Sequence, residues 1–380
     1  MKISENLELG KLMTFELPKH DPVHGWFWYK EGFAPGIFDY SARDKKPKVV
    51  LDPFCGVGTT LLAAKEQKID SVGVDASPLA VFISKTKTED YSQSDIDELK
   101  AFLHRSKGMK NDEQLRWEFE LFDPRAVFPK RNLNQILTLR SSIEEEVPRV
   151  RDILLLALLS VIPQASIMVK DGGVLKIKKN KRALPAKEIF KRKVKKIVRE
   201  LEARETFGHV PKVFLGDARA LDIPENSVDL ILTSPPYLNN IDYSKVYGLE
   251  LSLLQMSKAL AQEVRMRAIR SFIGKQMEVS QMPPEVGEIG EKIPIVGTYF
   301  KDMELAIEEM FRTLKPGGHA DIVVANSVIH ENHILVDEIF GQMAERIGFS
   351  DVEIIVGSYR IADVKPQKVK TRESIVRIKK

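Results

Sequence analysis

The segment VVLDPFCGVGTT, residues 49–60, decides the fold. Its apolar start, Val49 to Leu51, predicts a buried strand, and the threonines at its end begin the helix-like run TTLLAAK. Between strand and helix, Gly56 and Gly58 allow the backbone to turn tightly and to approach a ligand closely, as in nucleotide-binding α/β folds. The segment therefore predicts a strand, a glycine turn and a helix.

A second predicted strand, SVGVD at residues 71–75, ends in Asp75, seventeen residues after Gly58. Nucleotide-binding α/β folds hold ribose hydroxyls with an acid at this position. The dinucleotide fingerprint G-x-G-x-x-G requires a third glycine, whereas Thr59 and Thr60 follow the second one here. NAD is therefore disfavoured as the ligand.

The motif TSPPY, residues 233–237, follows another strand-like run, VDLIL at 228–232. Open α/β sheets bind their ligands at the carboxyl ends of the strands, so this loop is predicted to lie beside the glycine turn. The rings of Pro235 and Pro236 each fix φ and remove a backbone donor, which stiffens the loop.

Together the two motifs resemble those of the S-adenosylmethionine-dependent amino-methyltransferases that modify cytosine N4 or adenine N6 in nucleic acids. The resemblance implies a class I, Rossmann-like α/β fold with a seven-stranded, mostly parallel sheet, and S-adenosyl-L-methionine as cofactor. In this family the acid that opens the loop holds the methionine amino group, and the resemblance gives that role to Asp52. By the same resemblance Asp75 holds the ribose. The other predicted loop contacts are Pro53, Phe54, Gly56, Gly58 and Thr59.

The chemistry of an exocyclic base amine explains the second motif. Such an amine is a poor nucleophile because its lone pair is delocalised into the ring, and two acceptors aimed at its N–H groups stabilise the charge that develops in the transition state. By resemblance the acceptors are the Ser234 side chain and the Pro235 carbonyl, with Pro236 as support and Tyr237 stacked on the base. The predicted reaction is direct methyl transfer, without a metal or a covalent intermediate.

Two further segments are expected to contact the cofactor. VFLGDA, residues 213–218, predicts a strand ending in Asp217 and Ala218, and in similar methyltransferases the aspartate accepts from the adenine amino group; alternatively, Asp217 caps the next turn. The aromatic segment WFWYKEGFAP, residues 26–35, resembles the part of the family that closes over the methionine end, which points to Phe33 and Pro35. Alternatively, these clustered aromatic residues belong to the hydrophobic core and do not contact the cofactor.

Composition restricts the function classes. The chain has 380 residues and a single cysteine, Cys55, which excludes an internal disulfide framework and a thiolate zinc cluster. Cysteine-nucleophile chemistry fits poorly because Cys55 lies in the cofactor loop, and the seven scattered histidines predict no metal site. The apolar run at 153–162 is far shorter than the roughly 20 residues that span a bilayer. We expect a cytoplasmic protein.

The motif positions suggest one catalytic domain with two insertions. Residues 1–90 and 209–380 form the predicted methyltransferase domain, residues 91–208 a mostly helical, basic insertion, and residues 238–295 a smaller insertion near the target-base pocket. The smaller insertion begins with four polar residues that either line this pocket or cap the following helix: Asn239, Asn240, Asp242 and Tyr243.

The basic insertion carries the strongest charge feature of the chain. Residues 170–199 hold thirteen Lys or Arg and two acids, whereas the whole chain has a net charge of +4, so the remainder is acidic. Such a segment is typical of a phosphate-binding surface, although a basic helix is often only a solvated face. The predicted nucleic-acid contacts are Lys170, Lys176, Lys178, Lys179, Lys181, Arg182, Lys191, Arg192 and Lys195.

The choice between RNA and DNA depends on weaker signals. A target base must leave its stack in either polymer, and serine before the two prolines is more typical of cytosine N4 than of adenine N6 enzymes. The chain resembles an archaeal branch that acts on cytidine N4 of small-subunit ribosomal RNA. The absence of a recognisable DNA-recognition module after TSPPY, the basic insertion and a basic loop near the C-terminus favour RNA. The alternative is a DNA N4-cytosine or N6-adenine modification enzyme.

Two rival functions are weighed against these. A non-catalytic RNA-binding assembly factor on a methyltransferase scaffold would not need both intact motifs. Guanosine N2 methyltransferases of transfer RNA usually carry D-P-P-Y, and Ser234 occupies the place of that acid. The sequence does not specify the target position, the number of methyl groups added or the oligomeric state.

Overall fold

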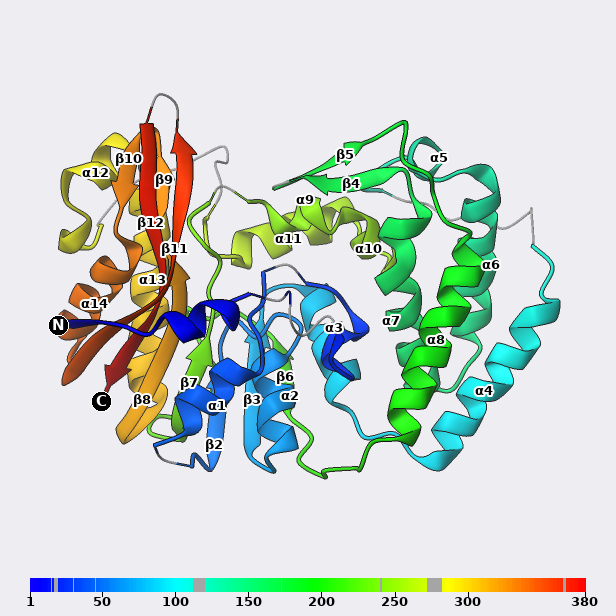
Figure 1. Ribbon diagram of the computed structural model, residues 1–380, viewed down its shortest axis with the longest axis horizontal. Coiled ribbons are helices and arrows are strands. Elements are labelled where there is room, and N and C mark those ends of the chain that lie inside the picture. The colour runs from blue at the N-terminus through cyan, green and yellow to red at the C-terminus, as the bar shows by residue number, and fades with distance from the viewer. Residues whose placement is uncertain are drawn as a thin grey trace.

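A computed structural model describes the chain except for residues 15, 17–19, 30, 45, 112–119, 172, 240, 272–281 and 365–366. Its centre is an eight-stranded sheet with the order β1-β11-β12-β8-β7-β2-β3-β6 (Figure 1). The bounds are β1 Lys2–Glu5, β2 Val49–Asp52, β3 Asp70–Asp75, β6 Lys212–Leu215, β7 Val228–Thr233, β8 Leu314–Ala325, β11 Asp351–Val364 and β12 Gln367–Lys379.

The expected class I α/β fold is confirmed, but the sheet has eight strands rather than seven. The additional strand is β1, which pairs in parallel with β11 from Lys2↔Glu353 to Glu5↔Val356. A four-residue strand without regular alternation, at the very start of the chain, carries no local signal strong enough to predict it. The C-terminal strands β11 and β12 form an antiparallel pair.

The pairing brings the motif-bearing strand ends to one edge of the sheet. Strands β2, β3, β6, β7 and β8 are mutually parallel, and β12 runs antiparallel to β8. Asp52 and Thr233 end neighbouring strands, and Asp75 pairs with Leu215 at the next junction. The predicted cofactor and target loops therefore follow strands that end side by side, as the parallel arrangement requires.

Helices cover both faces of this sheet. On one face, α1 (Gly36–Ala42) and α2 (Thr59–Glu66) share a buried cluster with Val50, Leu230 and Ile375. On the other face, α13 (Pro294–Thr313) and α14 (Val336–Ile347) pack against Leu51, Ile231 and Ile322. Helix α3 (Pro78–Thr88) contacts β3 and β6, and the Ser77 side chain caps its first turn by accepting from Ala80 N. The apolar strands are buried on both sides, as their continuous hydrophobic runs require.

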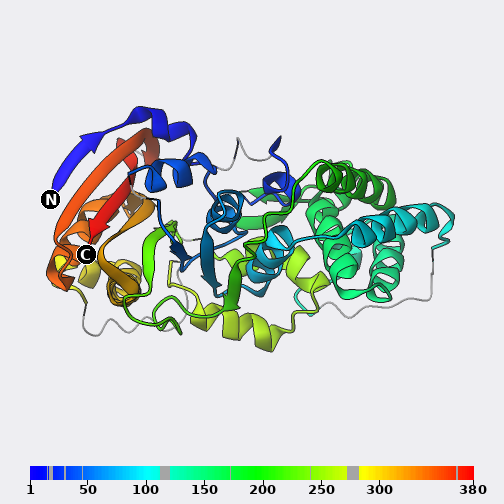
Figure 2. The same cartoon turned by 90° about the horizontal axis from the view of Figure 1, so that it is seen from below.

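The described residues between 91 and 208 form a helical unit beside the β6 end of the sheet (Figure 2). It contains α4 Gln93–Gly108, α5 Pro124–Val127, α6 Lys130–Glu144, α7 Pro148–Ala165 and α8 Ala186–Glu202. Helix α7 is its buried centre, since Leu154, Leu156 and Leu158 have no exposed surface. A hairpin that we did not expect, β4 (Met168–Asp171) with β5 (Val174–Ile177), connects α7 to α8.

The smaller insertion supplies three short helices at the pocket edge, α9 Tyr243–Val246, α10 Gly248–Leu253 and α11 Lys258–Arg267. Its last helix, α12 Gly287–Lys292, packs on α13 instead. Helix α10 packs on α7, which connects this insertion to the helical unit. The other short elements are the 3-10 turns Leu7–Lys11, His24–Trp26 and Pro284–Val286, and the hairpin of β9 (Ser327–Ile329) and β10 (Asn332–Ile334). None of the helices in the described part of the chain is long and apolar enough to cross a membrane.

Candidate functional site

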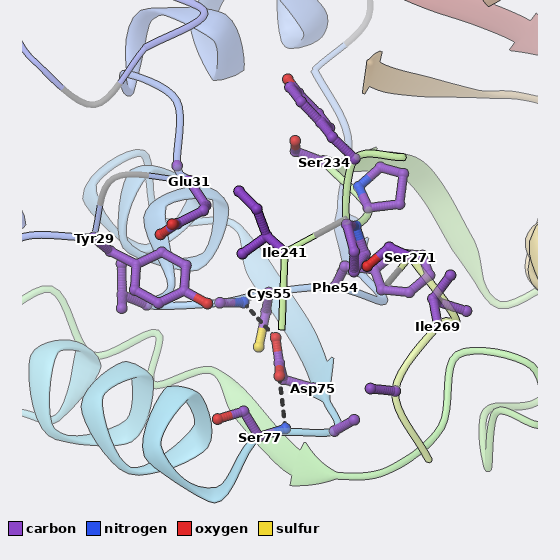
Figure 3. Close-up of a pocket in the computed structure, with 18 of the residues that line it drawn as sticks. Tyr29, Glu31, Phe54, Cys55, Asp75, Ser77, Ser234, Ile241, Ile269 and Ser271 are labelled. Atoms are coloured by element: carbon purple, nitrogen blue, oxygen red, sulfur yellow. Dashed lines mark hydrogen bonds between the residues drawn. The ribbon is translucent and has the colours of Figure 1, made fainter. Parts of the chain in front are cut away.

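A cavity of about 520 Å³ opens at the carboxyl edge of the parallel strands. The glycine loop, the TSPPY loop, the aromatic N-terminal segment and the start of the smaller insertion all contribute to its wall (Figure 3). The predicted residues on this wall are Phe33, Asp52, Pro53, Phe54, Gly56, Thr59, Asp75, Asp217, Ala218, Ser234, Pro235, Pro236, Tyr237, Asn239 and Asp242. One cavity thus collects residues from segments more than 200 positions apart in the sequence.

The glycine loop has the conformation that its sequence predicts. Gly56 and Gly58 both have positive φ, 48° and 79°. A Cβ on Gly58 would lie 2.4 Å from Ser84 Oγ, so that glycine is required for packing against α3, whereas a Cβ on Gly56 would meet only Tyr29, at 3.6 Å. Gly56 therefore leaves room on the cavity side, and Gly58 supports the loop from behind without lining the cavity.

Asp75 connects the loop to the end of β3. Its carboxylate accepts from Gly56 N and from Ser77 N, each at 2.8 Å (Figure 3). Burial raises the pKa of Asp75 to about 6, although both hydrogen bonds oppose this shift. Such a carboxylate is held rigidly and faces the cavity, which suits it to accept from hydroxyl groups of a ligand.

Asp52 is a deeply buried acid of the site, with 2% of its surface exposed. Its Oδ1 accepts from the Thr233 hydroxyl at 2.6 Å and from Phe54 N at 3.2 Å. Burial raises the pKa of Asp52 to about 7, despite hydrogen bonds that favour the ionised form. A bound cation would restore the lower pKa, so the site is suited to a cationic ligand group.

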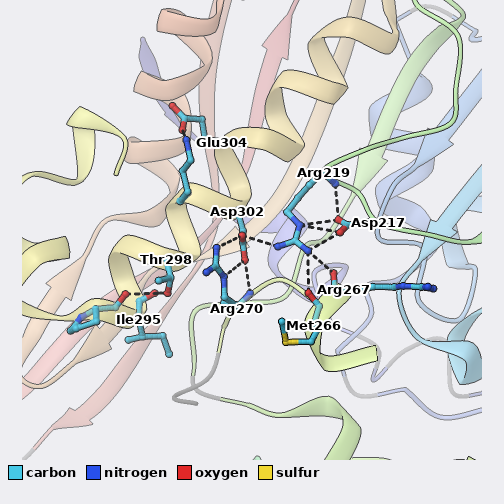
Figure 4. Close-up of polar contacts among 11 residues, drawn as sticks. Asp217, Arg219, Met266, Arg267, Arg270, Ile295, Thr298, Asp302 and Glu304 are labelled. Atoms are coloured by element: carbon cyan, nitrogen blue, oxygen red, sulfur yellow. Dashed lines mark hydrogen bonds and ion pairs between the residues drawn. The ribbon is translucent and has the colours of Figure 1, made fainter. Parts of the chain in front are cut away.

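Asp217 belongs to a polar network that the sequence did not reveal (Figure 4). Arg219 donates to both of its carboxylate oxygens, Nε to Oδ1 at 2.9 Å and Nη2 to Oδ2 at 2.7 Å. Nη1 of the same arginine donates to the buried Asp302 at 2.9 Å, and Nη2 contacts the carbonyls of Met266 and Arg267 at 3.3 Å. Arg219 therefore joins the end of β6 to α13 and α11.

Asp302 is shared by a second arginine. Arg270 donates to it through Nη2 at 2.6 Å, through Nε at 2.9 Å and through its backbone N at 3.0 Å. Burial alone would raise the pKa of Asp302, but its bonds to Arg270 and Arg219 outweigh this and lower it. The network holds the neighbouring Ile269 and Ser271 against the cavity. Because its members lie about 85 positions apart in sequence, no local pattern could have predicted it.

The TSPPY loop continues directly from β7. Tyr237 donates its hydroxyl to Glu373 Oε1 at 3.0 Å, and Arg360 Nη2 donates to the other oxygen of Glu373 at 2.6 Å. Glu373 is 2% exposed, and burial raises its pKa above the ordinary value. Glu373 and Arg360 both line the cavity, and neither was predicted because they stand on β12 and β11 without a motif of their own.

The polar residues after TSPPY have different surroundings. Asn239 is exposed at the cavity rim, whereas Asp242 is 8% exposed and is paired with Arg265 and with the Ser244 hydroxyl. Tyr243 is the first residue of α9, and its side chain lies outside the described part of the structure. Its position at a helix start is the one that the capping alternative expected. Asn240 also lies outside the described residues.

The aromatic N-terminal segment is part of the cavity wall, but only one of its two predicted cofactor contacts lines the cavity. Phe33 lines the cavity and is 5% exposed, whereas Pro35 is the N-cap of α1 and does not line it. Tyr29 stacks on Tyr247 of α10, with ring centroids 4.9 Å apart and planes at 16°, and the Tyr247 hydroxyl donates to Glu31 at 2.7 Å. Tyr29 and Glu31 thus contribute more to the cavity than Pro35 does.

Two of the predicted nucleic-acid contacts are internal, which corrects the sequence-based expectation. Lys170 Nζ lies 2.9 Å from Glu250 and 3.5 Å from the centre of the Tyr247 ring. Lys181 Nζ donates to the carbonyls of Pro163 and Met168, and burial lowers its pKa. Lys170 connects the hairpin to α10, and Lys181 connects it to the end of α7. An ammonium that is shielded from water needs such acceptors, which only the folded chain supplies.

The other predicted basic residues have accessible side chains. Exposed positions are Lys176, Lys178, Lys179, Arg182, Arg192 and Lys195, and Lys191 is half-buried. The positions up to Arg182 are on or just after the β4–β5 hairpin, which lies at the same end of the molecule as the cavity edge, whereas α8 runs away from that end (Figure 1). The tip of the hairpin lies against the cavity wall, since a Cβ on Gly173 would lie 2.9 Å from Ile241. Lys176, Lys178 and Lys179 are on β5 or follow it, toward the base of the hairpin.

Metal and thiol chemistry receive no support from the described residues. Among them, no group of three or more His, Cys, Asp or Glu side chains is arranged so that it could hold a metal ion. Cys55 is a buried free cysteine, and burial raises the pKa of its thiol well above the ordinary value. A thiol in this state is a poor nucleophile.

Comparisons with known proteins agree with this site. A family profile described as DNA methylase, for N6 and N4 methyltransferases, matches residues 42–86. The type II methyltransferase M.BsoBI of Geobacillus stearothermophilus is 24% identical over 419 residues, which cover 90% of this chain and 82% of that protein. M.AvaI of Nostoc sp. strain PCC 7120 is 26% identical over 418 residues, which cover 94% of this chain and 85% of that protein.

Among solved structures, a methyltransferase from Methanosarcina mazei that depends on S-adenosylmethionine is similar over 87% of this chain and 92% of that chain, at 10% identity and a TM-score of 0.29. The family and sequence matches support the N4-cytosine and N6-adenine methyltransferase family. They support an enzyme that uses S-adenosylmethionine and acts on nucleic acid.

Proposed function

We propose that this S-adenosylmethionine-dependent methyltransferase modifies DNA, at the exocyclic N4 amine of cytosine. The observation that carries the proposal is the single cavity in which the glycine loop, with Asp52 and Asp75, meets the Ser234–Tyr237 loop. The RNA reading made from the sequence is not supported by the comparisons, because the matching profile is one of DNA methylases and the long matches are type II methyltransferases. The DNA alternative fits these relatives better.

The residues present fit the cofactor. Gly56 leaves open space at the loop, Asp75 offers a fixed carboxylate for ribose hydroxyls, and the raised pKa of Asp52 marks a buried acid that a cationic amino group would satisfy. Asp217 and Ala218 line the remaining side, where the adenine would lie. Arg219 donates a hydrogen bond to each of the two Asp217 carboxylate oxygens. An adenine amino group would therefore donate to the lone pairs that remain on those oxygens. When bound, the cofactor supplies an electrophilic methyl group on a sulfonium.

Ser234 and Pro235 would act on the target amine. The Ser234 hydroxyl and the Pro235 carbonyl accept from the two N–H groups, which favours the nitrogen geometry needed for attack. Tyr237, held by Glu373, would stack on the flipped cytosine, and its hydroxyl is already oriented by that bond. The proton released from N4 leaves to water at the open side of the cavity. Serine at position 234 favours cytosine N4 over adenine N6.

We assign DNA backbone contacts to the exposed part of the basic insertion. Lys176 on β5 and Lys178, Lys179 and Arg182 after it are exposed, on the hairpin whose tip lies against the cavity wall. Phosphate contacts of this kind position a duplex without reading its sequence. Lys170 and Lys181 are excluded from this surface by their internal bonds.

Cofactor binding should weaken as the pH falls. Because the raised pKa of Asp52 is about 7, the free protein carries a proton there at lower pH, and binding a cationic amino group requires its release. We expect the dissociation constant to rise toward about tenfold per pH unit below about pH 7. Calorimetry between about pH 5.5 and 8.5 measures this, and buffers of different ionisation enthalpy report the released proton.

The control for this pH dependence is Asp52→Asn, which should bind weakly and with a flat profile. A flat profile in the unmodified protein would contradict the role of Asp52. The stability of the unliganded protein should change in the opposite sense. A raised acid pKa stabilises the fold below the unfolded value of about 4 and loses that contribution as the pH rises through about 7.

The product of the reaction tests the proposed function. Labelled S-adenosylmethionine is incubated with unmethylated genomic DNA and, separately, with total RNA, and the nucleosides are identified by mass spectrometry. We expect N4-methyldeoxycytidine from the DNA. N6-methyldeoxyadenosine would retain DNA and change the base, methylated cytidine in RNA alone would overturn the DNA assignment, and no transfer to either polymer would favour a non-catalytic binding factor.

A further inference from the structure

Strands β11 and β12 extend beyond the sheet as a two-stranded ribbon, made of the described residues 358–364 and 367–372. Their mutual pairing continues to Val364↔Gln367, whereas β8 leaves β12 at Glu373↔Ala325 and β1 leaves β11 at Val356. No other strand of the described chain pairs with the ribbon. It is therefore a projecting arm rather than part of the central layer.

The ribbon projects from the edge at which the cavity opens. Strand β8 is parallel to β7 and pairs Thr233 with Ile322, so both strands end at that edge. Glu373 pairs with Ala325 at the end of β8, and the ribbon residues that precede Glu373 lie beyond it. Figure 1 shows the ribbon rising above the sheet, with the β4–β5 hairpin at the same end on the other side of the molecule.

The ribbon is basic and accessible. Residues 358–372 contain five Lys or Arg and one acid. Lys368 and Lys370 are exposed, and Lys370 Nζ lies 3.7 Å from the centre of the Tyr359 ring. Ile361, which pairs with Lys370 across the ribbon, is 70% exposed. An exposed, two-stranded basic element of this kind is suited to a nucleic-acid backbone.

The base of the ribbon is part of the cavity wall. Arg360 lies on that wall with 57% of its side chain exposed, while its Nη2 donates to Glu373. Glu373 in turn accepts from Tyr237, the predicted platform for the target base. A base that enters the cavity brings its own phosphate to the rim, and the remaining guanidinium donors of Arg360 can reach such a group in the bidentate manner that arginine favours.

We propose that the ribbon binds the phosphate backbone of the target DNA strand, with Arg360 at the phosphate of the flipped nucleotide and Lys368 and Lys370 at flanking phosphates. This inference rests on the proposed action on DNA. It adds a second contact surface, separate from the helical insertion. The duplex then lies across the cavity edge, between the ribbon and the β4–β5 hairpin.

The primary test is the double variant Lys368→Gln, Lys370→Gln. Both side chains are exposed, so the fold and the affinity for S-adenosylmethionine should be unchanged. Binding is measured by fluorescence anisotropy with labelled fragments of unmethylated duplex DNA, from about 50 to 200 mM salt. We expect about tenfold weaker binding at the higher salt, and a log–log salt slope reduced by about 1 to 2, since each lost phosphate contact removes roughly 0.9.

Arg360→Gln provides the second variant. It should raise KM for DNA more than it lowers kcat, and Arg360→Lys should recover only part of the affinity because an ammonium lacks the planar fork. The matched control is Lys46→Gln, Lys212→Gln: both lysines are exposed and precede or begin β2 and β6, at the edge opposite the cavity. This control should bind DNA like the unmodified protein.

The ribbon proposal is overturned if the Lys368 and Lys370 variant keeps the affinity and salt slope of the unmodified protein, or if the control pair loses as much. It is also overturned if the variant loses affinity for RNA but not for duplex DNA. An unmodified protein that transfers methyl groups only to RNA would instead overturn the proposed function. Methylation of DNA together with an unaffected ribbon variant would leave that function intact and reject the ribbon alone.

Discussion

Replacing Ser234 by alanine is expected to lower kcat about 100- to 1,000-fold, the usual effect of removing one group that stabilises developing charge in a transition state. The serine lines the cavity at the end of β7, next to the Asp52 side of the site. Its hydroxyl would contact the target amine and not the cofactor, so the affinity for S-adenosylmethionine should stay within about twofold. Single-turnover methyl transfer to duplex DNA and calorimetry with the cofactor measure the two quantities separately.

Ser227→Ala is the matched control for this variant, since Ser227 precedes the amino end of the same strand and its hydroxyl donates locally, to the Pro224 carbonyl. It should leave kcat unchanged. Two results would remove Ser234 from the reaction: near-normal turnover in Ser234→Ala, or a loss of turnover explained entirely by weaker cofactor binding or a lower melting temperature.

Replacing Asp75 by alanine is expected to weaken S-adenosylmethionine binding about 100-fold, roughly 2.7 kcal/mol. The carboxylate would lose its bonds to ribose hydroxyls, and the loop would lose the two bonds that Asp75 accepts from Gly56 N and Ser77 N. Hydrogen bonds to a charged group contribute roughly 1.5 to 3 kcal/mol each, so an effect of this size is expected even if the loop partly adjusts. Calorimetry with the cofactor alone measures it.

Asp70→Ala is the control, because Asp70 begins the same strand at the opposite edge, is exposed, and its side chain pairs with His209 there. It should bind the cofactor normally. Asp75→Asn should be intermediate, since its single amide oxygen can keep only one of the two bonds that Asp75 accepts from Gly56 N and Ser77 N. Normal binding by Asp75→Ala would place the ribose elsewhere.

The sequence alone was sufficient for the class of fold and for the centre of the site. VVLDPFCGVGTT and TSPPY are contiguous, and each specifies its own strand and turn through apolar runs, glycines and prolines. Parallel strands end at a common edge, so two such loops must meet there. For this reason Asp52, Asp75 and the Ser234–Tyr237 loop could be expected together before their distances were known, and one cavity does hold them.

Only the tertiary structure decided which partners these residues have. Three contacts show this: Arg219 with Asp217, Glu373 with Tyr237, and Tyr247 with Tyr29. No periodicity or spacing in the sequence predicts any of them. The basic segment is a second example. Composition alone suggests that Lys170 and Lys181 are available to bind phosphate, whereas in the fold both have internal acceptors. Local sequence determines strands, turns and motif chemistry, whereas long-range packing determines which polar side chains remain available to a ligand.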